Sequence, residues 1–239
     1  MYQVVLITGG TAGIGLALAE AFMKAGACVA VCARSPAALA RFSRLYPGAL
    51  AFRADVTVAA ERAALLDAVN DRFGRLDVLI NNAGTFIERK FLHDKDVNDG
   101  LEQELALNLT APIRLTGEVL KRWPSISSLV FVSSGFALVS PTRAPTYGAA
   151  KAGIHAFAES LRRQLAPAGI HVLELLPPAT DTQMNAEFTG KKMSAADVAE
   201  VTLVALARRR PMALPGDTRL LPPLLRLAPR TIERMVAKL

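Results

Sequence analysis

The opening stretch constrains the fold most, because an apolar run, Val4–Thr8, leads straight into a glycine-rich turn, Gly9-Gly-Thr-Ala-Gly-Ile-Gly15. An amphipathic stretch follows and stops at Gly26, a residue type that often ends helices. The order strand, glycine turn, helix is typical of phosphate-binding sites, because the glycines admit a pyrophosphate and the helix N-terminus offers free N–H groups. A tight turn without a ligand is the alternative.

Strand-like and helix-like segments alternate along the whole chain. The sequence predicts strands near 3–8, 27–33, 49–54, 76–81, 127–133 and 170–176, a weak last strand near 211–214, and helices near 14–25, 36–46, 58–73, 99–122, 147–166 and 194–208. This order indicates an α/β fold: a Rossmann-type, doubly wound parallel sheet of about seven strands with helices on both faces. With 239 residues, 51% of them hydrophobic, we expect one dinucleotide-binding domain over 1–239.

The segment Tyr147-Gly-Ala-Ala-Lys151 places a tyrosine and a lysine four residues apart. Residues at this spacing share one face of a helix, so the ammonium lies near the phenol. A nearby positive charge favours the phenolate and lowers the tyrosine pKa from its ordinary value of about 10. The pair therefore predicts a proton-transfer group that works near neutral pH.

Further motifs stand around this pair. Asn81-Asn-Ala-Gly84 follows a strand-like run, Asn108 lies in a helical segment, and Ser134 stands thirteen residues before Tyr147. Together with the pattern T-G-x-x-x-G-x-G over Thr8–Gly15, they resemble the short-chain dehydrogenase/reductase family over most of the chain. Within that family, three segments are similar to the DltE-like branch, whose members mostly have no assigned substrate: Ser133–Val139, Ala149–His155 and Leu175–Thr182.

The resemblance implies an oxidoreductase that moves hydride between a nicotinamide cofactor and a carbonyl or alcohol. In the reductive direction Tyr147 gives a proton to the oxygen, while Ser134 orients and stabilises it. Lys151 lowers the tyrosine pKa and holds the nicotinamide ribose, and Asn108 kinks its helix and holds a water linked to Lys151. Taken alone, Ser134 fits a strand-end cap and Asn108 an ordinary polar helix residue.

The end of the second strand bears on the choice of cofactor. It reads Val31-Cys-Ala-Arg34-Ser35, and no acidic residue occurs between Glu20 and Asp55 to hold a ribose 2′-OH. The Arg34 guanidinium suits a 2′-phosphate, and Ser35 adds a hydroxyl. We therefore favour NADP(H) over NAD(H); the alternative is that Arg34 only points into water.

The resemblance also implies other cofactor contacts. Asp55, with Val56, matches the adenine-binding position, although Asp55 or Thr57 also suits the N-cap of the next helix. The segment after the sixth strand has Pro178 where the family usually has glycine, which stiffens the turn. The remaining predicted contacts come from Thr8, Gly9, Thr11, Gly13, Ile14, Gly15, Asn81, Ala83, Gly84, Tyr147, Lys151, Pro177, Thr180 and Thr182.

A protein of another class remains an alternative, namely a sensor or scaffold that binds NADP(H) without turnover. We favour the enzyme because such proteins typically lose the tyrosine or the lysine, and this chain has both. The predicted substrate is a small carbonyl or alcohol compound with an apolar body. The apolar residues expected around it are Phe86, Phe136, Leu138, Met184 and Phe188.

Charge is concentrated at the C-terminal end, where residues 191–239 carry ten Lys and Arg against four Asp and Glu. We expect the stretch 178–239 to supply the substrate loop and a basic tail, with a helix over Thr231–Leu239. We favour a tail that covers the substrate pocket or packs against a partner subunit. Contact with an anionic membrane or an acidic protein is less favoured, and nucleic acid least, because no recognition motif accompanies the charge.

Several expectations concern the cell and the assembly. No apolar run is long enough to span a membrane, and the first strand leaves no room for a signal peptide, so we expect a cytoplasmic protein. Cys28 and Cys32 share one strand, and we expect two buried free thiols. No His/Cys/Asp/Glu cluster has metal-ligand spacing, so we expect no metal. Family members commonly pair the helices near 99–122 and 147–166, which predicts a homodimer or homotetramer.

Overall fold

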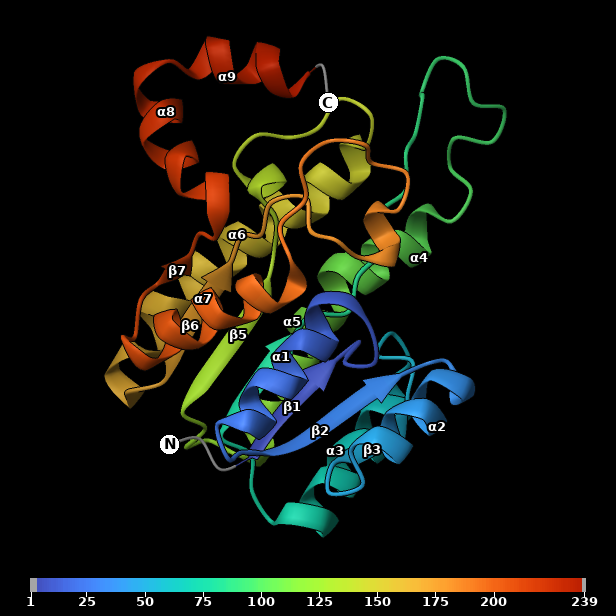
Figure 1. The fold of residues 1–239 in the computed structure, drawn as a ribbon, viewed down its shortest axis with the longest axis vertical. Helices are drawn as coiled ribbons and strands as arrows, with labels where there is room; N and C mark the ends of the chain where they lie inside the picture. The colour runs from blue at the N-terminus through green and yellow to red at the C-terminus, as the bar shows by residue number, and fades with distance from the viewer. Residues whose placement is uncertain (1–3, 238–239) are drawn as a thin grey trace.

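The computed structural model of the protein describes residues 4–237 and contains one parallel sheet with helices on both sides (Figure 1). The strands are β1 Val4–Thr8, β2 Cys28–Ala33, β3 Leu50–Arg53, β4 Val78–Asn81, β5 Ser128–Val132, β6 His171–Leu175 and β7 Met212–Ala213. The longer helices are α1 Gly13–Lys24, α2 Pro36–Leu45, α3 Ala59–Phe73, α5 Ala111–Arg122, α6 Pro145–Leu165, α7 Ala195–Ala207, α8 Leu221–Leu227 and α9 Pro229–Val236. Each predicted strand is present within two residues at either end, so the predicted α/β fold is confirmed.

The sheet has the strand order β3-β2-β1-β4-β5-β6-β7, and every neighbouring pair is parallel. Its central strands are buried on both faces, which explains why β1, β4 and β5 read as nearly continuous apolar runs. Alternate residues of β1 serve two cores. Val4 and Leu6 face α3, α5 and α6, whereas Val5 and Ile7 face α1, α2 and α7.

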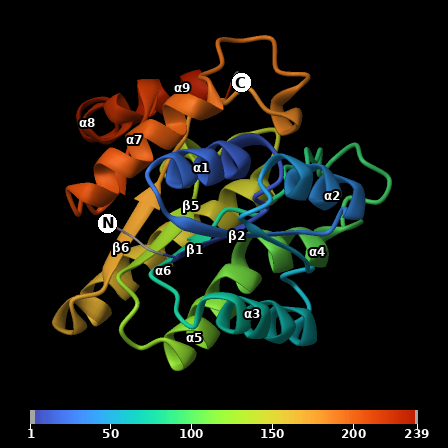
Figure 2. The same ribbon diagram turned by 60° about the horizontal axis from the view of Figure 1, so that its bottom comes forward.

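Figure 2 shows the same layers, with α1 and α7 on one side of the sheet and α3, α5 and α6 on the other. Because all the strands run the same way, their carboxyl ends share one edge of the sheet. The chain reverses its winding between β1 and β4, which is where open sheets of this kind bind ligands. The glycine turn after β1 and the segments after β4, β5 and β6 therefore meet at that edge.

The predicted helix near 99–122 is not continuous. It consists of α4 (Leu101–Leu105), a π-helical turn η1 (Ala106–Thr110) and α5, and Asn108 lies in the π turn. The stretch that forms α8 was not predicted to be a helix. Its prolines stand in the first turn of that helix, where a missing N–H has no consequence. The predicted helix over Thr231–Leu239 corresponds to α9, and Lys238 and Leu239 lie outside the described residues.

The expectation of two buried thiols is wrong for Cys28. This residue begins β2 at the far end of the sheet and is exposed, whereas Cys32 is buried; both are free. Burial raises the pKa of the Cys32 thiol to about 12, so it stays protonated. Within residues 4–237, no helix is long and apolar enough to cross a bilayer.

Candidate active site

One cavity of about 510 Å³ lies at the carboxyl edge of the sheet. Its walls come from the turns after β1, β2, β3, β4, β5 and β6 and from the C-terminal helices. Of the residues predicted from the sequence, the cavity brings together Gly9, Gly13, Ile14, Arg34, Asp55, Val56, Ala83, Gly84, Ser134, Tyr147, Lys151, Pro177, Thr180 and Thr182. Six others do not line the cavity: Thr8, Thr11, Gly15, Ser35, Asn81 and Asn108.

The N-terminus of α1 faces this cavity without a side-chain cap from any described residue, because Ala12 occupies the N-cap position. Gly13 has φ +53°, and a methyl group there would lie 3.0 Å from Thr182 Cγ2. Only glycine suits both the backbone angle and the close approach of the opposite wall. The first amides of the helix are thus left free to bind an anion.

Arg34 lies at one end of the cavity and is paired with Asp55, with 3.8 Å between Arg34 Nη1 and Asp55 Oδ2. The Arg34 side chain is 73% exposed, so the pair is weak and the guanidinium is free to reorient. Burial raises the pKa of Asp55, but hydrogen bonds from Thr57 and the charge of Arg34 outweigh it and hold the pKa below its usual range. Ser35 does not line the cavity; its hydroxyl caps α2 by accepting from Ala38 N.

The alternative role of Asp55 or Thr57 as the N-cap of the next helix is wrong. Helix α3 begins at Ala59, and Val58 stands at the N-cap position. Asp55 Oδ1 instead accepts from the backbone N and the hydroxyl of Thr57, at 2.9 and 2.7 Å. This local turn fixes the carboxylate on the cavity wall.

Ser134, Tyr147 and Lys151 converge on another part of the wall. The Ser134 hydroxyl makes a hydrogen bond with the Tyr147 side chain. Lys151 Nζ lies 5.5 Å from the centre of the tyrosine ring and donates to Val132 O at 2.9 Å. All three side chains are largely buried, because α6 packs against the turn Gly135–Ala137 after β5, against β6 and against the π turn η1.

The expectation that the pair gives the tyrosine a lowered pKa is wrong for this structure. Burial raises the pKa of Tyr147 to about 12, more than the hydrogen bond from Ser134 lowers it. Burial also lowers the pKa of Lys151 to about 8, although the negative charge of Glu174 opposes the shift. At neutral pH the phenol is therefore protonated, and the lysine is mostly charged.

Asn108 lies behind the wall and interrupts its helix, as predicted, by a π-helical turn. Its side chain bonds both backbone groups of Thr85, with Nδ2 donating to Thr85 O at 2.9 Å and Oδ1 accepting from Thr85 N at 3.0 Å. A methyl group at Gly84 would lie 2.8 Å from Asn108 Oδ1, so the contact requires glycine there. Asn108 thus holds the chain after β4 against the π turn.

Thr8 and Asn81 support the wall from behind, and Asn82, which the sequence analysis did not select, forms part of it. Thr8 Oγ1 accepts from the backbone N of Asn82 and of Ala83, at 2.9 and 3.0 Å. Asn82 Nδ2 donates to Thr8 O at 2.8 Å and to Gly9 O at 3.2 Å. Asn81 turns away and donates to Thr116 Oγ1. The end of β4 is thereby tied to the glycine turn.

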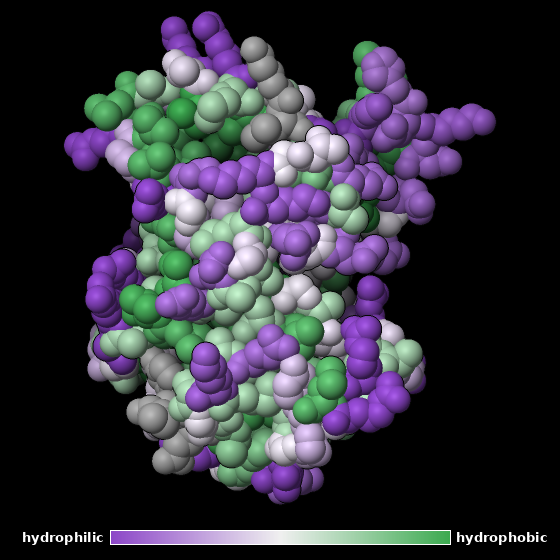
Figure 3. All heavy atoms as spheres, in the orientation of Figure 1, coloured by the Kyte–Doolittle hydropathy of each residue, from purple (hydrophilic) through white to green (hydrophobic). Residues whose placement is uncertain are grey.

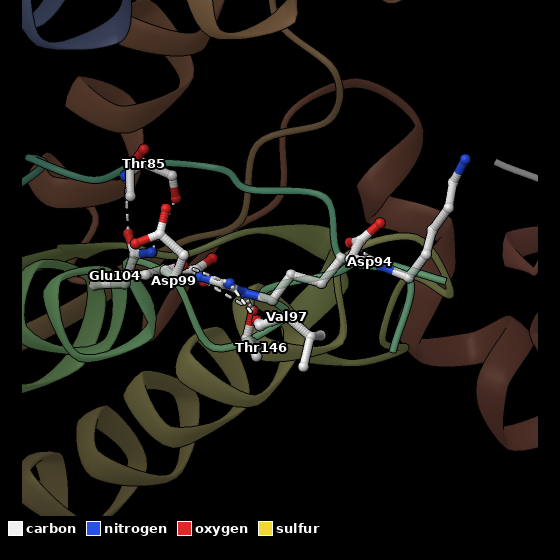
Figure 4. Close-up of polar contacts among 9 residues, drawn as sticks. Thr85, Asp94, Val97, Asp99, Glu104 and Thr146 are labelled. Atoms are coloured by element: carbon white, nitrogen blue, oxygen red, sulfur yellow. Dashed lines mark hydrogen bonds and ion pairs between the residues drawn. The ribbon is translucent and has the colours of Figure 1, made fainter. Parts of the chain in front are cut away.

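A buried ion pair next to the site was also missed (Figure 4). Glu104, fully buried on α4, accepts from Arg89 Nη2 at 3.1 Å and from Thr146 Oγ1 at 2.8 Å. Arg89 Nη1 also donates to Val97 O and Asp99 O, both at 2.7 Å. The group ties the loop after β4 to the residue before Tyr147. No local spacing signals it, because its members stand 15 and 42 residues apart.

A second missed carboxylate is Glu174, which is 1% exposed on the β6 face toward α6. Glu174 Oε2 bonds His155 Nδ1 at 2.7 Å, and the two form a pair one helical turn beyond Lys151. This contact places His155 against the sheet. In the part of the chain from 4 to 237, no three His, Cys, Asp or Glu side chains group as metal ligands do.

Comparison with known proteins gives a consistent assignment. The family model described as short chain dehydrogenase matches residues 3–192. The chain is 36% identical over 197 residues to the uncharacterized oxidoreductase DltE of Bacillus subtilis, covering 79% of this chain and 75% of that protein. It is 32% identical over 216 residues to an uncharacterized oxidoreductase of Staphylococcus epidermidis, covering 86% and 91%.

Solved structures agree. A short-chain dehydrogenase from Streptomyces avermitilis superposes with a TM-score of 0.84 at 28% identity, over 98% of this chain and 96% of that one. A short-chain dehydrogenase from Sphingobium yanoikuyae, in complex with NADPH, has a TM-score of 0.81 at 28% identity, over 97% and 95%. From its sequence, its sheet and these matches, the chain belongs to the short-chain dehydrogenase/reductase family and is DltE-like.

Proposed function

We propose that the protein is an NADP(H)-dependent oxidoreductase that interconverts a carbonyl compound and its alcohol. The observation that carries this proposal is the convergence of Ser134, Tyr147 and Lys151 on a cavity that also receives the free N-terminus of α1. One part of that cavity suits acid–base chemistry at an oxygen, and another suits a phosphate.

A nicotinamide nucleotide fits the residues present. The related structures include complexes with NADPH, from Sphingobium yanoikuyae and an actinorhodin polyketide ketoreductase, and one with NADH, from Brucella melitensis. In this chain the α1 amides beside Gly13 would hold the pyrophosphate, and Lys151 would hold the nicotinamide ribose. When bound, the nucleotide supplies or accepts hydride.

The chain's own residues manage the proton. Because Tyr147 is protonated at neutral pH, it is ready to donate to an oxygen that gains negative charge. Ser134, already hydrogen-bonded to the phenol, reaches the same oxygen and stabilises the charge. The Lys151 ammonium beside the ring stabilises the phenolate that remains. This arrangement favours reduction; alcohol oxidation reverses each proton step.

The preference for NADP(H) rests on Arg34. It is the cation on the wall at the end of β2, and its partner Asp55 binds it only loosely, at 3.8 Å. A 2′-phosphate offers a stronger, charge-assisted contact than that pair. Asp55 stays available to a polar group of the nucleotide.

The tail contributes to the proposed site as well. Thr218, Leu221, Met235 and Val236 line the same cavity as Tyr147, which supports a role for residues 178–239 in covering the substrate. The homodimer or homotetramer, the cytoplasmic location and the single domain over 1–239 remain predictions.

The decisive test is Tyr147→Phe. Loss of a positioned proton donor should lower kcat at least about a hundredfold. NADP(H) affinity should stay nearly unchanged, because the ring and Lys151 remain. Initial rates of NADPH oxidation over a panel of ketones and aldehydes, with fluorescence titration of NADPH, measure both quantities. Nucleotide binding without turnover of any compound by the wild type would favour the sensor or scaffold, and wild-type rates in the variant would exclude Tyr147 as the donor.

A further inference from the structure

The part of the cavity around Tyr147 is apolar and cationic. Its apolar wall includes Phe86, Phe136, Val139 and Leu221, and α9 closes it with Val236 packed against Val139. Figure 3 shows apolar side chains gathered over α8 and α9, the helices that form this cover. The charged residues lining the cavity are Arg34 and Asp55 near the end of β2, and Arg143 and Lys151 near Tyr147. The carboxylate therefore lies with Arg34, whereas the Tyr147 region has two cations.

One aromatic ring, that of Phe86, contacts both Arg143 and Tyr147. Its guanidinium carbon lies 5.1 Å from the centre of the Phe86 ring. The same ring meets Tyr147 edge-on, with 5.0 Å between the two ring centres. The Phe86 ring thus contacts both the guanidinium and the tyrosine ring.

The donors of Arg143 are only partly engaged. Nη1 donates to Glu88 Oε1 at 2.6 Å, and Glu88 is half exposed, which weakens the pair. Nε is buried and has no hydrogen-bond partner among residues 4–237. The neighbouring Arg89 differs, since its guanidinium bonds Glu104, Thr146 and two backbone carbonyls. Arg89 is a structural residue, whereas the Arg143 guanidinium has donors without a partner among the described residues.

We propose that the substrate is an anionic carbonyl compound, or its alcohol, whose oxyanion group binds Arg143 while its apolar body lies under α8 and α9. The inference rests on the proposed function and names the substrate class of that site. A guanidinium matches a carboxylate or a phosphate oxyanion through two parallel N–H donors. A planar fork held against Phe86 is already oriented for that contact, which lowers the ordering cost of binding.

The pyrophosphate of the nucleotide is a poor candidate for this contact. The α1 N-terminus meets Thr182, on the segment after β6, whereas Arg143 stacks on Phe86, on the loop after β4. The two anion-binding positions therefore belong to different walls of the cavity, and loss of the Arg143 charge should leave nucleotide affinity unchanged.

The test compares matched substrates and variants. Straight-chain oxo acids of one length, with the ketone at different distances from the carboxylate, are assayed against their methyl esters and against ketones ending in a phosphonate. We expect the best acid or phosphonate to exceed the ester in kcat/KM by about ten- to a hundredfold, the value of one charge-assisted contact. Whichever of the carboxylate and the phosphonate has the higher kcat/KM identifies the oxyanion group that the site binds.

Arg143→Gln should remove that preference by raising KM for the anion, with the ester changed less than about threefold. Arg143→Lys keeps the charge but not the fork and should give an intermediate value. Glu88→Gln is the matched control: it removes the competing carboxylate and should strengthen the preference. Unfolding curves and NADPH titrations show that each variant is folded and still binds nucleotide.

Equal kcat/KM for acid and ester in the wild type, or equal losses for both in Arg143→Gln, would overturn the inference and leave the reductase assignment intact. Calorimetry with a straight-chain alkanoate, in the presence of NADP⁺, separates binding from chemistry. Alkanoate binding that needs Arg143 without turnover of any ketone supports the anion site and refutes the reductase. If the alkanoate does not bind and no ketone is turned over, both the anion site and the reductase assignment are refuted.

Discussion

Two glycines, one in α1 and one in α5, allow the same substitution to be compared in opposite settings. A methyl group at Gly15 would lie 2.5 Å from Asn82 Nδ2 and 2.9 Å from the Gly9 carbonyl carbon, and closer still to Gly9 O. A methyl group at Gly117 would have no heavy atom of the described residues within 4 Å, apart from its chain neighbours and the backbone of its own helix. In Gly15→Ala, the backbone of the glycine turn or the Asn82 amide must therefore move.

The expected magnitudes follow from these contacts. Alanine in place of glycine stabilises a helix by about 0.5–1 kcal/mol, so Gly117→Ala should raise the free energy of unfolding by that amount. Gly15→Ala has the same gain, but overpacking costs about 1–3 kcal/mol. Each of the two hydrogen bonds from Asn82 Nδ2 adds a loss of about 0.5–1.5 kcal/mol. The net expectation for Gly15→Ala is a loss of about 1–5.5 kcal/mol.

The assay is urea unfolding of both variants, followed by NADPH titration. Because Gly9 lines the cavity, its displacement should also weaken nucleotide binding by at least about tenfold in Gly15→Ala, but not in Gly117→Ala. A Gly15→Ala protein as stable as Gly117→Ala, with wild-type NADPH affinity, would refute the argument that the turn is packed too closely for a methyl group.

Three further outcomes are expected. Arg34→Asp should lower NADP(H) affinity about ten- to a hundredfold. It should bring little gain in NAD(H) affinity, because the new carboxylate would face Asp55. An unchanged ratio of kcat/KM for the two cofactors would contradict the role of Arg34. Burial lowers the pKa of Lys151 to about 8, and the charged form is the active one, so the rate of reduction should fall as pH rises through about 8. Lys151→Arg, if active, should not show this fall in rate. A pH–rate profile of the wild type that stays flat around pH 8 would oppose this. Light scattering should show a homodimer or homotetramer at micromolar concentration, and a 25.5 kDa species alone would exclude both.

The sheet was predictable because buried parallel strands are short apolar runs bounded by turn residues, as in Val78–Asn81 and Ser128–Val132. The kink at Asn108 was expected only through the family resemblance, since nothing in the apolar periodicity interrupts the helix there, and its form as a π turn was not expected. Helix α8 was not predicted because the stretch 221–227 contains prolines, which disrupt the interior of a helix but are tolerated in its first turn.

The electrostatics of the site were less predictable. The spacing of Tyr147 and Lys151 correctly places the ammonium near the ring, but spacing carries no measure of burial. Burial turned out to dominate the phenol pKa. Glu104 and Glu174 were missed for a related reason, because their partners lie far away in the sequence.

The position of α8 and α9 has a consequence for synthesis and handling of the protein. The strand β1 is made first, and β2 and β4 pair with it soon afterwards, so the nucleotide-binding half of the sheet can assemble early during translation. The wall provided by Leu221, Met235 and Val236 is the last described part of the cavity to leave the ribosome. A nascent chain should therefore acquire nucleotide affinity before it can enclose a substrate, and a bulky C-terminal fusion should impair turnover more than nucleotide binding.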